Sequence, residues 1–174
     1  WSHQGDRLAF SSTRRNGVDR DIYVMDPRDP ASARLVLELK GGGWGALDWS
    51  PDDKHLVVIE YVSVNESYLW LVDVATGERR LLTPKGGKVP VAYDGAQFSR
   101  DGKGLFVTTD RDAEFMRLAY VDLAAGKHRY LTTDLNWDVE GFDVAPDGKS
   151  IAFVTNEDGA SVLHRIDAVH LPHT

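Results

Sequence analysis

A five-residue phrase recurs four times along the chain, and an apolar run follows each copy. The copies begin at residues 1, 49, 98 and 144, so successive copies lie 46 to 49 residues apart. They read Trp1-Ser2-His3-Gln4-Gly5, Trp49-Ser50-Pro51-Asp52-Asp53, Phe98-Ser99-Arg100-Asp101-Gly102 and Val144-Ala145-Pro146-Asp147-Gly148. A repeat of this length indicates a structural unit that cannot bury its apolar faces alone, so neighbouring units must stack to form a core.

The third copy is the clearest guide to what one repeat contains. Tyr93 to Phe98 is predicted as a short innermost strand, and Gly104 to Thr109 as a strand rich in β-branched and aromatic residues. Met116 to Leu123 alternates well enough for a half-buried strand, and His128 to Thr132 follows as the outer strand. One repeat therefore predicts a four-stranded antiparallel sheet.

The recurring phrase has the composition of a tight turn. Pro51 and Pro146 preset φ near about −65° at the second turn position, and Gly102 and Gly148 supply the left-handed conformation that closes the hairpin. The second copy has Asp53 in place of that glycine, and Asp tolerates a left-handed backbone better than most residues do. The phrase therefore predicts a turn between the first and second strands of each repeat.

The same alignment places strands in the other repeats. They are Arg7 to Ser11, Asp21 to Asp26 and Arg34 to Leu39 in the first, Gly45 to Trp49, His55 to Glu60, Tyr68 to Val74 and Arg80 to Thr83 in the second, and Val139 to Val144, Ser150 to Thr155 and Val162 to Asp167 in the fourth. No segment has convincing helical periodicity with caps at both ends. The predicted class is all-β, a partial β-propeller with about three and a half to four blades of four-stranded antiparallel sheet. We expect one domain over 1–174, with repeats at 1–43, 44–91, 92–137 and 138–174.

Both ends of the chain fall inside a repeat. Trp1 is the last residue of a predicted innermost strand, and in the fourth repeat only Val169 to Leu171 could begin an outer strand. Because propellers close into rings of roughly four to eight blades, we expect the chain to be a piece of a larger protein that supplies further blades. Unpaired sheet edges are prone to pairing, so we expect the isolated piece to form edge-mediated homo-oligomers.

Charge and composition exclude several partners and leave the compartment open. The formal net charge of −7 disfavours nucleic acid as a partner, and no apolar run is long enough to span a membrane. The chain has no cysteine, which excludes disulfides and thiolate metal sites. No targeting signal is present, and cytoplasmic and periplasmic locations both fit.

No motif in the chain predicts catalysis, a metal or a cofactor. There is no Gly-x-Ser-x-Gly nucleophile elbow, so we expect no catalytic residue in this chain. His164, His170 and His173 lie close together in sequence but lack the convergent ligand set of a metal site, and a frayed terminus explains them better. The aspartates of the turns do not have the spacing of a Ca²⁺ loop.

The loops between the second and third strands are the best candidates for contact with another molecule. In a propeller these equivalent loops would line up on one face. Ordinary solvated loops are the competing interpretation. The predicted peptide-facing or partner-facing residues are Arg14, Arg15, Glu60, Tyr61, Asn65, Glu66, Arg111, Asp112 and Glu114, with Asn156 and Glu157 as their counterparts in the fourth repeat.

The amino-acid sequence of the repeat resembles that of one type of propeller. The turn and strand from Trp49 to Val58, its variants at 98–103 and 145–153, and the repeat end from Leu71 to Glu78 are similar to the TolB-type repeat. Two groups of proteins share this repeat. One comprises the N-terminal propellers of prolyl oligopeptidase-like serine peptidases, dipeptidyl aminopeptidases included, and the other is TolB with its periplasmic relatives. The segments 60–68 and 108–115 look more like the peptidase propellers.

This resemblance implies a non-catalytic role. In the peptidase family the catalytic triad lies in a C-terminal α/β-hydrolase domain, and no residue of this chain matches it. Some family members bind the substrate amino terminus through a pair of glutamates, and this chain has no adjacent glutamate pair. We therefore expect a propeller that covers a hydrolase domain, limits access to small peptides and contacts peptide substrate.

Two alternatives to the peptidase propeller stay open. A TolB-like protein-interaction scaffold would have a secretory signal and a small α/β domain upstream of Trp1. A lyase or glycosidase propeller would carry histidines and carboxylates on its innermost strands. Here those strands offer carboxylates without histidine, namely Asp48, Asp94, Asp138, Glu140 and Asp143.

Overall fold

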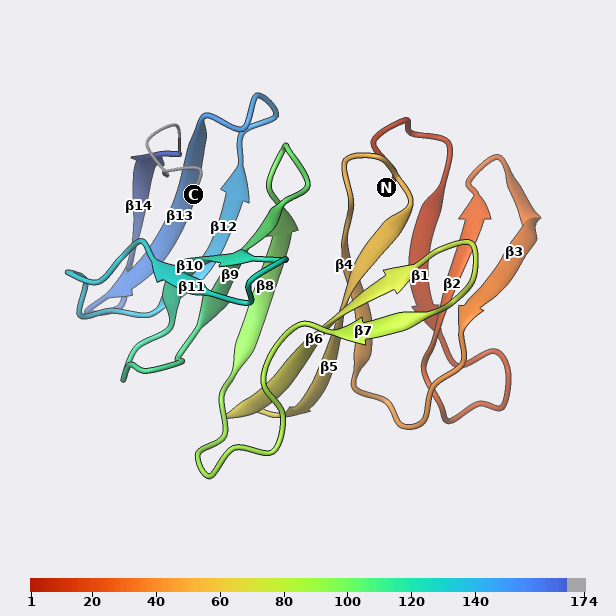
Figure 1. Ribbon diagram of the computed structural model, residues 1–174, viewed down its shortest axis with the longest axis horizontal. Helices are drawn as coiled ribbons and strands as arrows, with labels where there is room; N and C mark the ends of the chain where they lie inside the picture. The colour runs from red at the N-terminus through yellow and green to blue at the C-terminus, as the bar shows by residue number, and fades with distance from the viewer. Residues whose placement is uncertain (169–174) are drawn as a thin grey trace. The chain divides into compact units, whose positions relative to one another are not determined.

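The computed structural model describes residues 1–168, which form fourteen β-strands and no helix (Figure 1). The strands make four antiparallel sheets, two of three strands and two of four. The chain divides into two compact units, Trp1–Ala92 and Tyr93–Thr174. The all-β class and the antiparallel sheets predicted from the repeat are confirmed.

The first unit contains the sheets of the first two repeats. The three-stranded sheet has the order β1-β2-β3, with β1 (Leu8–Ser12), β2 (Asp21–Asp26) and β3 (Asp29–Leu37). The four-stranded sheet has the order β4-β5-β6-β7, with β4 (Trp44–Trp49), β5 (His55–Ser63), β6 (Glu66–Asp73) and β7 (Arg79–Leu81). Each sheet is therefore a meander, in which every strand pairs with its neighbour in sequence.

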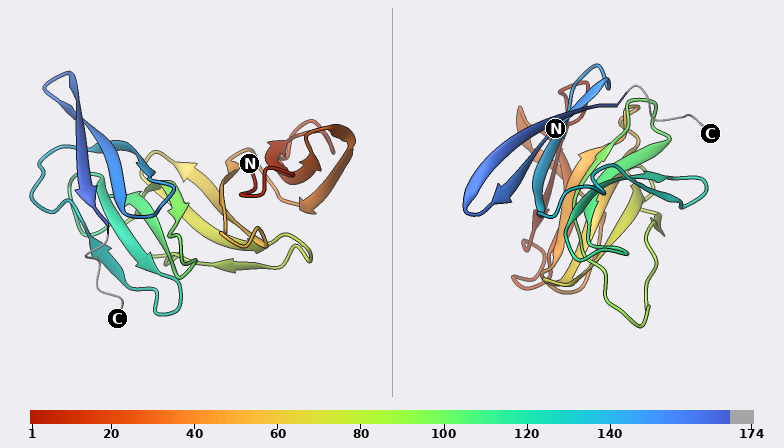
Figure 2. Two further views of the ribbon diagram at one scale, coloured as in Figure 1. Left: turned by 90° about the horizontal axis from the view of Figure 1, so that it is seen from above. Right: turned by 90° about the vertical axis from the view of Figure 1, so that its left-hand side faces the viewer.

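The second unit repeats this plan. Its four-stranded sheet contains β8 (Tyr93–Phe98), β9 (Gly104–Thr109), β10 (Arg117–Asp122) and β11 (His128–Tyr130) in sequence order. Its three-stranded sheet contains β12 (Val139–Val144), β13 (Ser150–Glu157) and β14 (Ala160–Asp167). The long β13–β14 hairpin is drawn in dark blue in Figure 2.

Strand ends differ from prediction mainly at three hairpins, and the largest difference is at β3, which begins at Asp29 and not at the predicted Arg34. The strands β2, β8, β9 and β12 have the predicted bounds. By contrast, β5 continues to Ser63 and β6 begins at Glu66, so only residues 64 and 65 connect them. β13 and β14 are joined by Asp158 and Gly159, which both have positive φ (51° and 86°), as a type I′ hairpin turn requires. Asn156 and Glu157 therefore lie on a strand and not in a loop.

A serine hydroxyl organises the recurring turn in three of the four repeats. In the second repeat, Ser50 Oγ donates to Asp52 Oδ1 at 2.6 Å and accepts the His55 N–H at 2.9 Å. In the third repeat, Ser99 Oγ donates to Asp101 and accepts the Gly104 N–H in the same way. The first repeat uses Ser2, and the fourth has alanine at this position. The serine hydroxyl therefore accepts a backbone N–H at or just before the start of the following strand.

Neighbouring turns contact each other, and each unit does so differently. In the first unit, the Asp53 carboxylate accepts the backbone N–H groups of His3 and Gln4 at 2.7 and 3.1 Å. In the second, Arg100 Nη1 donates to the Pro146 carbonyl at 2.5 Å. Within each unit, the turns of its two repeats are thus joined by specific polar contacts.

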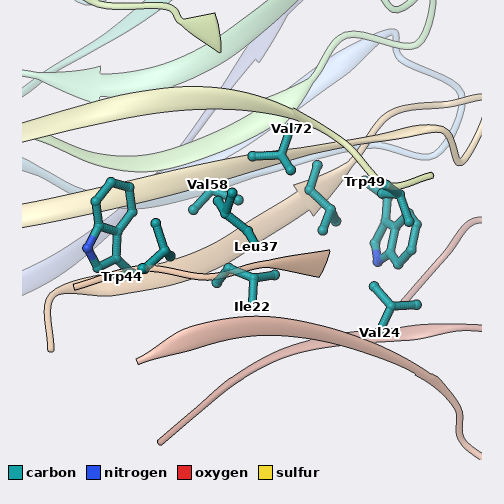
Figure 3. Close-up of a cluster of buried hydrophobic side chains, with 10 residues drawn as sticks. Ile22, Val24, Leu37, Trp44, Trp49, Val58 and Val72 are labelled. Atoms are coloured by element: carbon teal, nitrogen blue, oxygen red, sulfur yellow. The ribbon is translucent and has the colours of Figure 1, made fainter. Parts of the chain in front are cut away.

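The core of the first unit lies between its two sheets. Ile22, Val24 and Leu37 on one sheet pack against Val58 and Val72 on the other. The indoles of Trp44 and Trp49 lie at opposite ends of this cluster (Figure 3). Each fully buried aliphatic side chain contributes about 1.5–3 kcal/mol to folding.

The core of the second unit is equally apolar. Phe106 and Leu118 of the four-stranded sheet pack against Val139, Ile151 and Phe153 of the three-stranded sheet. The two sheets of each unit therefore share one core, as neighbouring repeats of a propeller do.

The single domain over 1–174 and the exact repeat bounds stay predictions. The segment Val169 to Leu171, with His170 and His173, lies outside the described residues.

Within residues 1–168, no helix is long and apolar enough to cross a membrane.

Candidate functional site

Arg15 is held inside its own loop by several acceptors. Its Nε donates to Asp21 Oδ2 at 2.8 Å, and its Nη2 donates to the Leu39 carbonyl at 3.0 Å. Asp19 and Glu38 lie within 3.3 and 3.4 Å of the guanidinium. Hydrogen bonding from Arg15 lowers the pKa of the buried Asp21 carboxyl, although burial opposes the shift. Arg15 therefore neutralises an internal charge and positions the loop.

Arg14 is placed quite differently from its neighbour. Its guanidinium carbon lies 5.2 Å from the centre of the Phe10 ring and 4.8 Å from that of Tyr23. These two rings stack with their centres 5.7 Å apart. None of the ion pairs found within residues 1–168 includes Arg14. Arg14 is thus exposed over an aromatic pair, where its donors can reach another molecule.

The two glutamates of the β5–β6 hairpin are turned toward their own sheet. Glu60 accepts the Trp70 indole N–H at 2.9 Å and the Lys85 ammonium at 2.9 and 3.0 Å. Glu66 accepts a short hydrogen bond from the Tyr68 hydroxyl, which raises the pKa of that tyrosine. Both carboxylates therefore have internal partners.

The tip of the same hairpin is apolar and exposed. Tyr61, Val62 and Val64 are 53%, 52% and 76% exposed. Asn65 is also exposed, and its backbone N–H donates to Ser63 Oγ at 3.3 Å. Of the predicted residues on this hairpin, Tyr61 and Asn65 are therefore the ones available to a partner.

The segment before β4 joins these two loops within the first unit. Gly41 donates its N–H to Asp19 Oδ1 at 2.8 Å and accepts that of Arg20 at 2.9 Å. Two residues later, the Gly43 carbonyl accepts the Tyr61 N–H at 2.6 Å. A Cβ at Gly43 would lie 1.9 Å from the Tyr61 carbonyl oxygen, so only glycine permits this approach. The structure thus brings together the loop of Arg14 and Arg15 and the hairpin of Tyr61.

Two of the three predicted residues of the third repeat take part in one network. The Asp112 carboxylate accepts the Tyr130 hydroxyl at 2.9 Å and lies 3.4 Å from Arg111 Nε. Burial and this hydrogen bond raise the pKa of Tyr130 to about 12. Asp112 has a φ of 56°, so it closes the turn in the left-handed region. Glu114 is exposed.

Tyr93 and His128 extend this network, and neither was predicted. The Tyr93 hydroxyl lies 3.0 Å from His128 Nε2. Burial raises the pKa of Tyr93, while burial and the positive charge of Arg111 lower the pKa of His128. The pair is separated by 35 residues and is brought together by the fold of the sheet, so no local motif marks it.

Glu157 forms a three-residue cluster with Thr155 and His164 that superficially resembles a triad. His164 Nε2 lies 2.8 Å from Thr155 Oγ1 and 3.1 Å from Glu157 Oε1. A catalytic histidine uses one ring nitrogen for the nucleophile and the other for the carboxylate, whereas both contacts here fall on one nitrogen. Thr155 is also fully buried, so the cluster is not arranged for nucleophilic chemistry. Asn156, beside it on β13, donates to Glu140 at 3.4 Å.

The described residues offer no metal site. Among residues 1–168, no group of three His, Asp or Glu side chains is arranged to hold a metal ion. Among the candidate residues, Arg14, Tyr61 and Asn65 are exposed in the first unit, and Glu114 is exposed in the second.

One curated relative covers almost the whole chain. No protein-family model matches the chain. The chain is 30% identical over 169 residues to the uncharacterized peptidase YuxL of Bacillus subtilis (strain 168). This match covers 95% of the chain but 23% of YuxL, so the chain spans about a quarter of that relative's length.

Solved structures share the fold. TolB from Acinetobacter baumannii matches with a TM-score of 0.77 and 22% identity, over 98% of this chain and 40% of TolB. The chain has the fold of a TolB-type β-propeller. Prolyl oligopeptidase B from Galerina marginata, in a structure bound to a 35mer substrate, matches this propeller with a TM-score of 0.73 and 12% identity, over 97% of this chain and 25% of that chain. The predicted partial propeller and its resemblance to both groups are therefore confirmed at the level of the fold.

Proposed function

We propose that this TolB-type propeller is the non-catalytic part of a prolyl oligopeptidase-like serine peptidase. The observation that carries the proposal is the 30% identity to the peptidase YuxL across 95% of the chain. The structural match to prolyl oligopeptidase B supports it through the fold. The catalytic triad would lie outside residues 1–174, in an α/β-hydrolase domain that the propeller covers.

Some of the candidate residues would contact peptide substrate, and the others would hold the loops in place. Arg14, Tyr61, Asn65 and Glu114 are exposed and would contact peptide substrate. The other predicted residues, which are Arg15, Glu60, Glu66, Arg111 and Asp112, have internal partners and would hold the loops in place. The exposed apolar tip of the β5–β6 hairpin favours peptides with apolar side chains, because burial of apolar surface would drive the contact.

The test uses the complete parent protein. A fluorophosphonate probe should label its nucleophilic serine, and the protein should hydrolyse short peptides. A series of peptides with one shared cleavage sequence, extending beyond the 35 residues bound by prolyl oligopeptidase B, then measures gating. We expect kcat/KM to fall steeply beyond a threshold length. Equal rates at all lengths would contradict gating, and absence of labelling would contradict the peptidase assignment.

Substrate contact is tested separately at the hairpin tip. The variant Tyr61→Ser/Val62→Thr/Val64→Thr should raise KM for peptides while leaving hydrolysis of a small ester substrate unchanged. The matched control is Val89→Thr, which changes an equally exposed valine outside the hairpin. If both variants leave peptide KM unchanged, the hairpin does not contact substrate.

A TolB-like interaction scaffold is the second candidate. The match to TolB, with a TM-score of 0.77 over 98% of the chain, favours it through the fold alone. A parent protein that neither reacts with the fluorophosphonate probe nor cleaves peptides, but forms a stable complex with another protein, would support this alternative.

We also propose that residues 1–174 self-associate through open strand edges when they are separated from the parent protein. The strands β1 and β14 lie at sheet edges in the described chain, where the repeat predicts one more strand. Light scattering over a range of concentrations should give a dimer or larger species. A monomeric mass at every concentration would contradict edge pairing.

A further inference from the structure

Three side chains of the four-stranded sheet in the first unit form a cage around an ammonium group. Glu60 pairs directly with Tyr68 across β5 and β6, and Trp70 lies two residues farther along β6 on the same face. The Lys85 Nζ lies 4.6 Å from the centre of the Tyr68 ring and 5.8 Å from that of Trp70. It also donates to both oxygens of Glu60, at 2.9 and 3.0 Å. The ammonium cage is defined by Glu60, Tyr68 and Trp70.

Each wall of the cage is fixed by its own contacts. The Trp70 indole N–H donates to Glu60 Oε2 at 2.9 Å, and the Tyr68 hydroxyl donates to Glu66. Tyr68 is buried, and the Glu60 side chain is only 17% exposed. The cage is therefore a built structure, in which two aromatic rings and a largely desolvated carboxylate surround one position.

The occupant of the cage, by contrast, is exposed and comes from a connecting segment. Lys85 follows β7, and its side chain is 44% exposed. The segment that carries it is anchored independently, because Thr83 Oγ1 accepts the Leu69 N–H and the Val91 carbonyl accepts the Ser67 N–H. Lys85 can therefore leave the cage while the segment stays attached to β6, and the cage is reached from the solvent side.

We propose that this cage is a binding site for an aliphatic ammonium group, and that Lys85 is an internal occupant which an external ammonium displaces. Aromatic rings attract a cation held over their faces, and the attraction is stronger where a carboxylate is partly desolvated. A lysine side chain or the amino terminus of a peptide would supply this group. The inference stands apart from the peptidase proposal, since it rests on the geometry of one sheet.

Lys85 competes with an external ligand for the cage and so sets the apparent affinity of that ligand. A tethered group acts at a high effective concentration, so the wild-type cage is occupied most of the time. The apparent affinity for an external ligand equals the intrinsic affinity multiplied by the fraction of cages that Lys85 leaves vacant. Removal of the Lys85 side chain should therefore tighten binding, which a purely structural role of Lys85 would not produce.

The test measures binding to the full chain by two-dimensional NMR. The Trp70 indole N–H is the reporter, because it donates directly to Glu60, and the variant Trp70→Phe assigns its signal. The probes are N-acetyl-lysine amide for a side-chain ammonium, norleucine amide for an α-ammonium, and N-acetyl-norleucine amide as the uncharged control. Comparison of the first two probes identifies which source of ammonium the cage prefers.

We expect Lys85→Ala to bind one of the charged probes about tenfold more tightly than the wild type does, and Lys85→Arg to bind it no more tightly. Adding Glu60→Gln to Lys85→Ala should remove the gain. Arg79→Ala is the matched control, since Arg79 lies 4.9 Å from the centre of the Trp70 ring but does not contact Glu60. The proposal is overturned if the charged probes bind no better than N-acetyl-norleucine amide, or if Lys85→Ala gives no gain. The Lys85 side chain is solvent-exposed, and an unchanged thermal melt of each variant confirms that it is folded.

Discussion

The hydroxyl of Tyr93 donates a hydrogen bond to Nε2 of His128, with 3.0 Å between the two atoms. The direction follows from the other ring nitrogen, because Nδ1 lies 3.3 Å from the Gly126 carbonyl, which can only accept. A proton on Nδ1 leaves Nε2 as an acceptor in the neutral ring. Burial raises the pKa of Tyr93 and lowers that of His128, so both groups stay neutral at neutral pH.

This arrangement predicts a loss of stability in mild acid. Because the pKa of His128 is lowered in the folded protein, the unfolded chain takes up a proton first as the pH falls below about 6.5. The free energy of unfolding should decrease below that pH and level off once the folded protein is also protonated. Urea unfolding at a series of pH values measures this, and His128→Gln should remove that part of the dependence.

Two variants separate this effect from others. Tyr93→Phe should cost about 1 kcal/mol at neutral pH, since it deletes the hydrogen bond to His128. His55→Gln removes a histidine from the other unit and serves as the control. An identical pH dependence in His128→Gln and in wild type would contradict the assigned role of His128.

The buried Asp21 should be among the most sensitive positions of the first unit. Asp21→Ala removes the carboxylate that accepts from Arg15 Nε and from the Leu39 N–H, and should cost about 2–3 kcal/mol. Chemical denaturation gives the free energy of unfolding. In a double-mutant cycle, Asp21→Asn combined with Arg15→Ala should cost less than the sum of the single changes, because the two residues act as one pair. Strict additivity would show that they do not.

Gly43 and Gly42 form a matched pair of glycines. Gly43→Ala should cost about 2–3 kcal/mol, because its Cβ would lie 1.9 Å from the Tyr61 carbonyl oxygen and push the β5–β6 hairpin away. Gly42→Ala should be nearly neutral, since its Cβ would have no atom within 4 Å. Thermal unfolding of the two variants checks the difference. Equal losses would mean that the close approach of Gly43 to Tyr61 does not matter for stability.

The contribution of Asp53 to the free energy of unfolding should divide into a part from its backbone conformation and a part from its carboxylate. Asp53→Gly keeps the left-handed backbone but loses the bonds to His3 and Gln4, at a cost of about 2 kcal/mol. Asp53→Ala should cost roughly 1 kcal/mol more, because alanine is strained at a φ of 56°. Denaturant unfolding measures both. If glycine stabilises the protein at this position, the carboxylate contributes nothing.

The same carboxylate predicts a second acid-sensitive contact. Burial by itself would raise the pKa of Asp53, but the hydrogen bonds from His3 and Gln4 outweigh it and hold the pKa below its usual range. Its contribution is therefore complete above about pH 4 and is lost as the pH falls through the lowered value. The variant Asp53→Asn should flatten the stability curve below pH 4. A curve unchanged from wild type would argue against this contact.

The strands could be predicted wherever local pattern and turn chemistry agree. The strand from Gly104 to Thr109 has β-forming residues throughout and follows a Ser-Arg-Asp-Gly turn, so both of its ends were correct. The β13–β14 hairpin was predicted too short, although Asp158-Gly159 is a known signal for a two-residue turn. A two-residue turn at Asp158-Gly159 places Asn156 and Glu157 on β13.

The contacts of the candidate site could not be predicted in the same way. Lys85 meets Glu60 across 25 residues, and Arg15 meets the Leu39 carbonyl across 24. Such pairs depend on the twist of a sheet and on the path of connecting segments, which residue types alone do not encode. The sequence therefore predicted which loops carry polar residues, but not which of those residues already have internal partners.

The different contacts between neighbouring turns bear on how a chain of similar repeats assembles in the right order. Tandem repeats can mispair during folding, because any two of them present similar faces to each other. Here the first turn offers two N–H groups to an aspartate that only the second turn has at that position. The third turn instead offers an arginine to the fourth, where a Cβ at Gly148 would lie 2.9 Å from the Arg100 Cβ. An exchange of the second and fourth repeats would put Gly148 where the first turn needs the Asp53 carboxylate, and would put Asp53 where the third turn leaves no room for a Cβ. These few side chains therefore make each repeat specific for its neighbour within the unit.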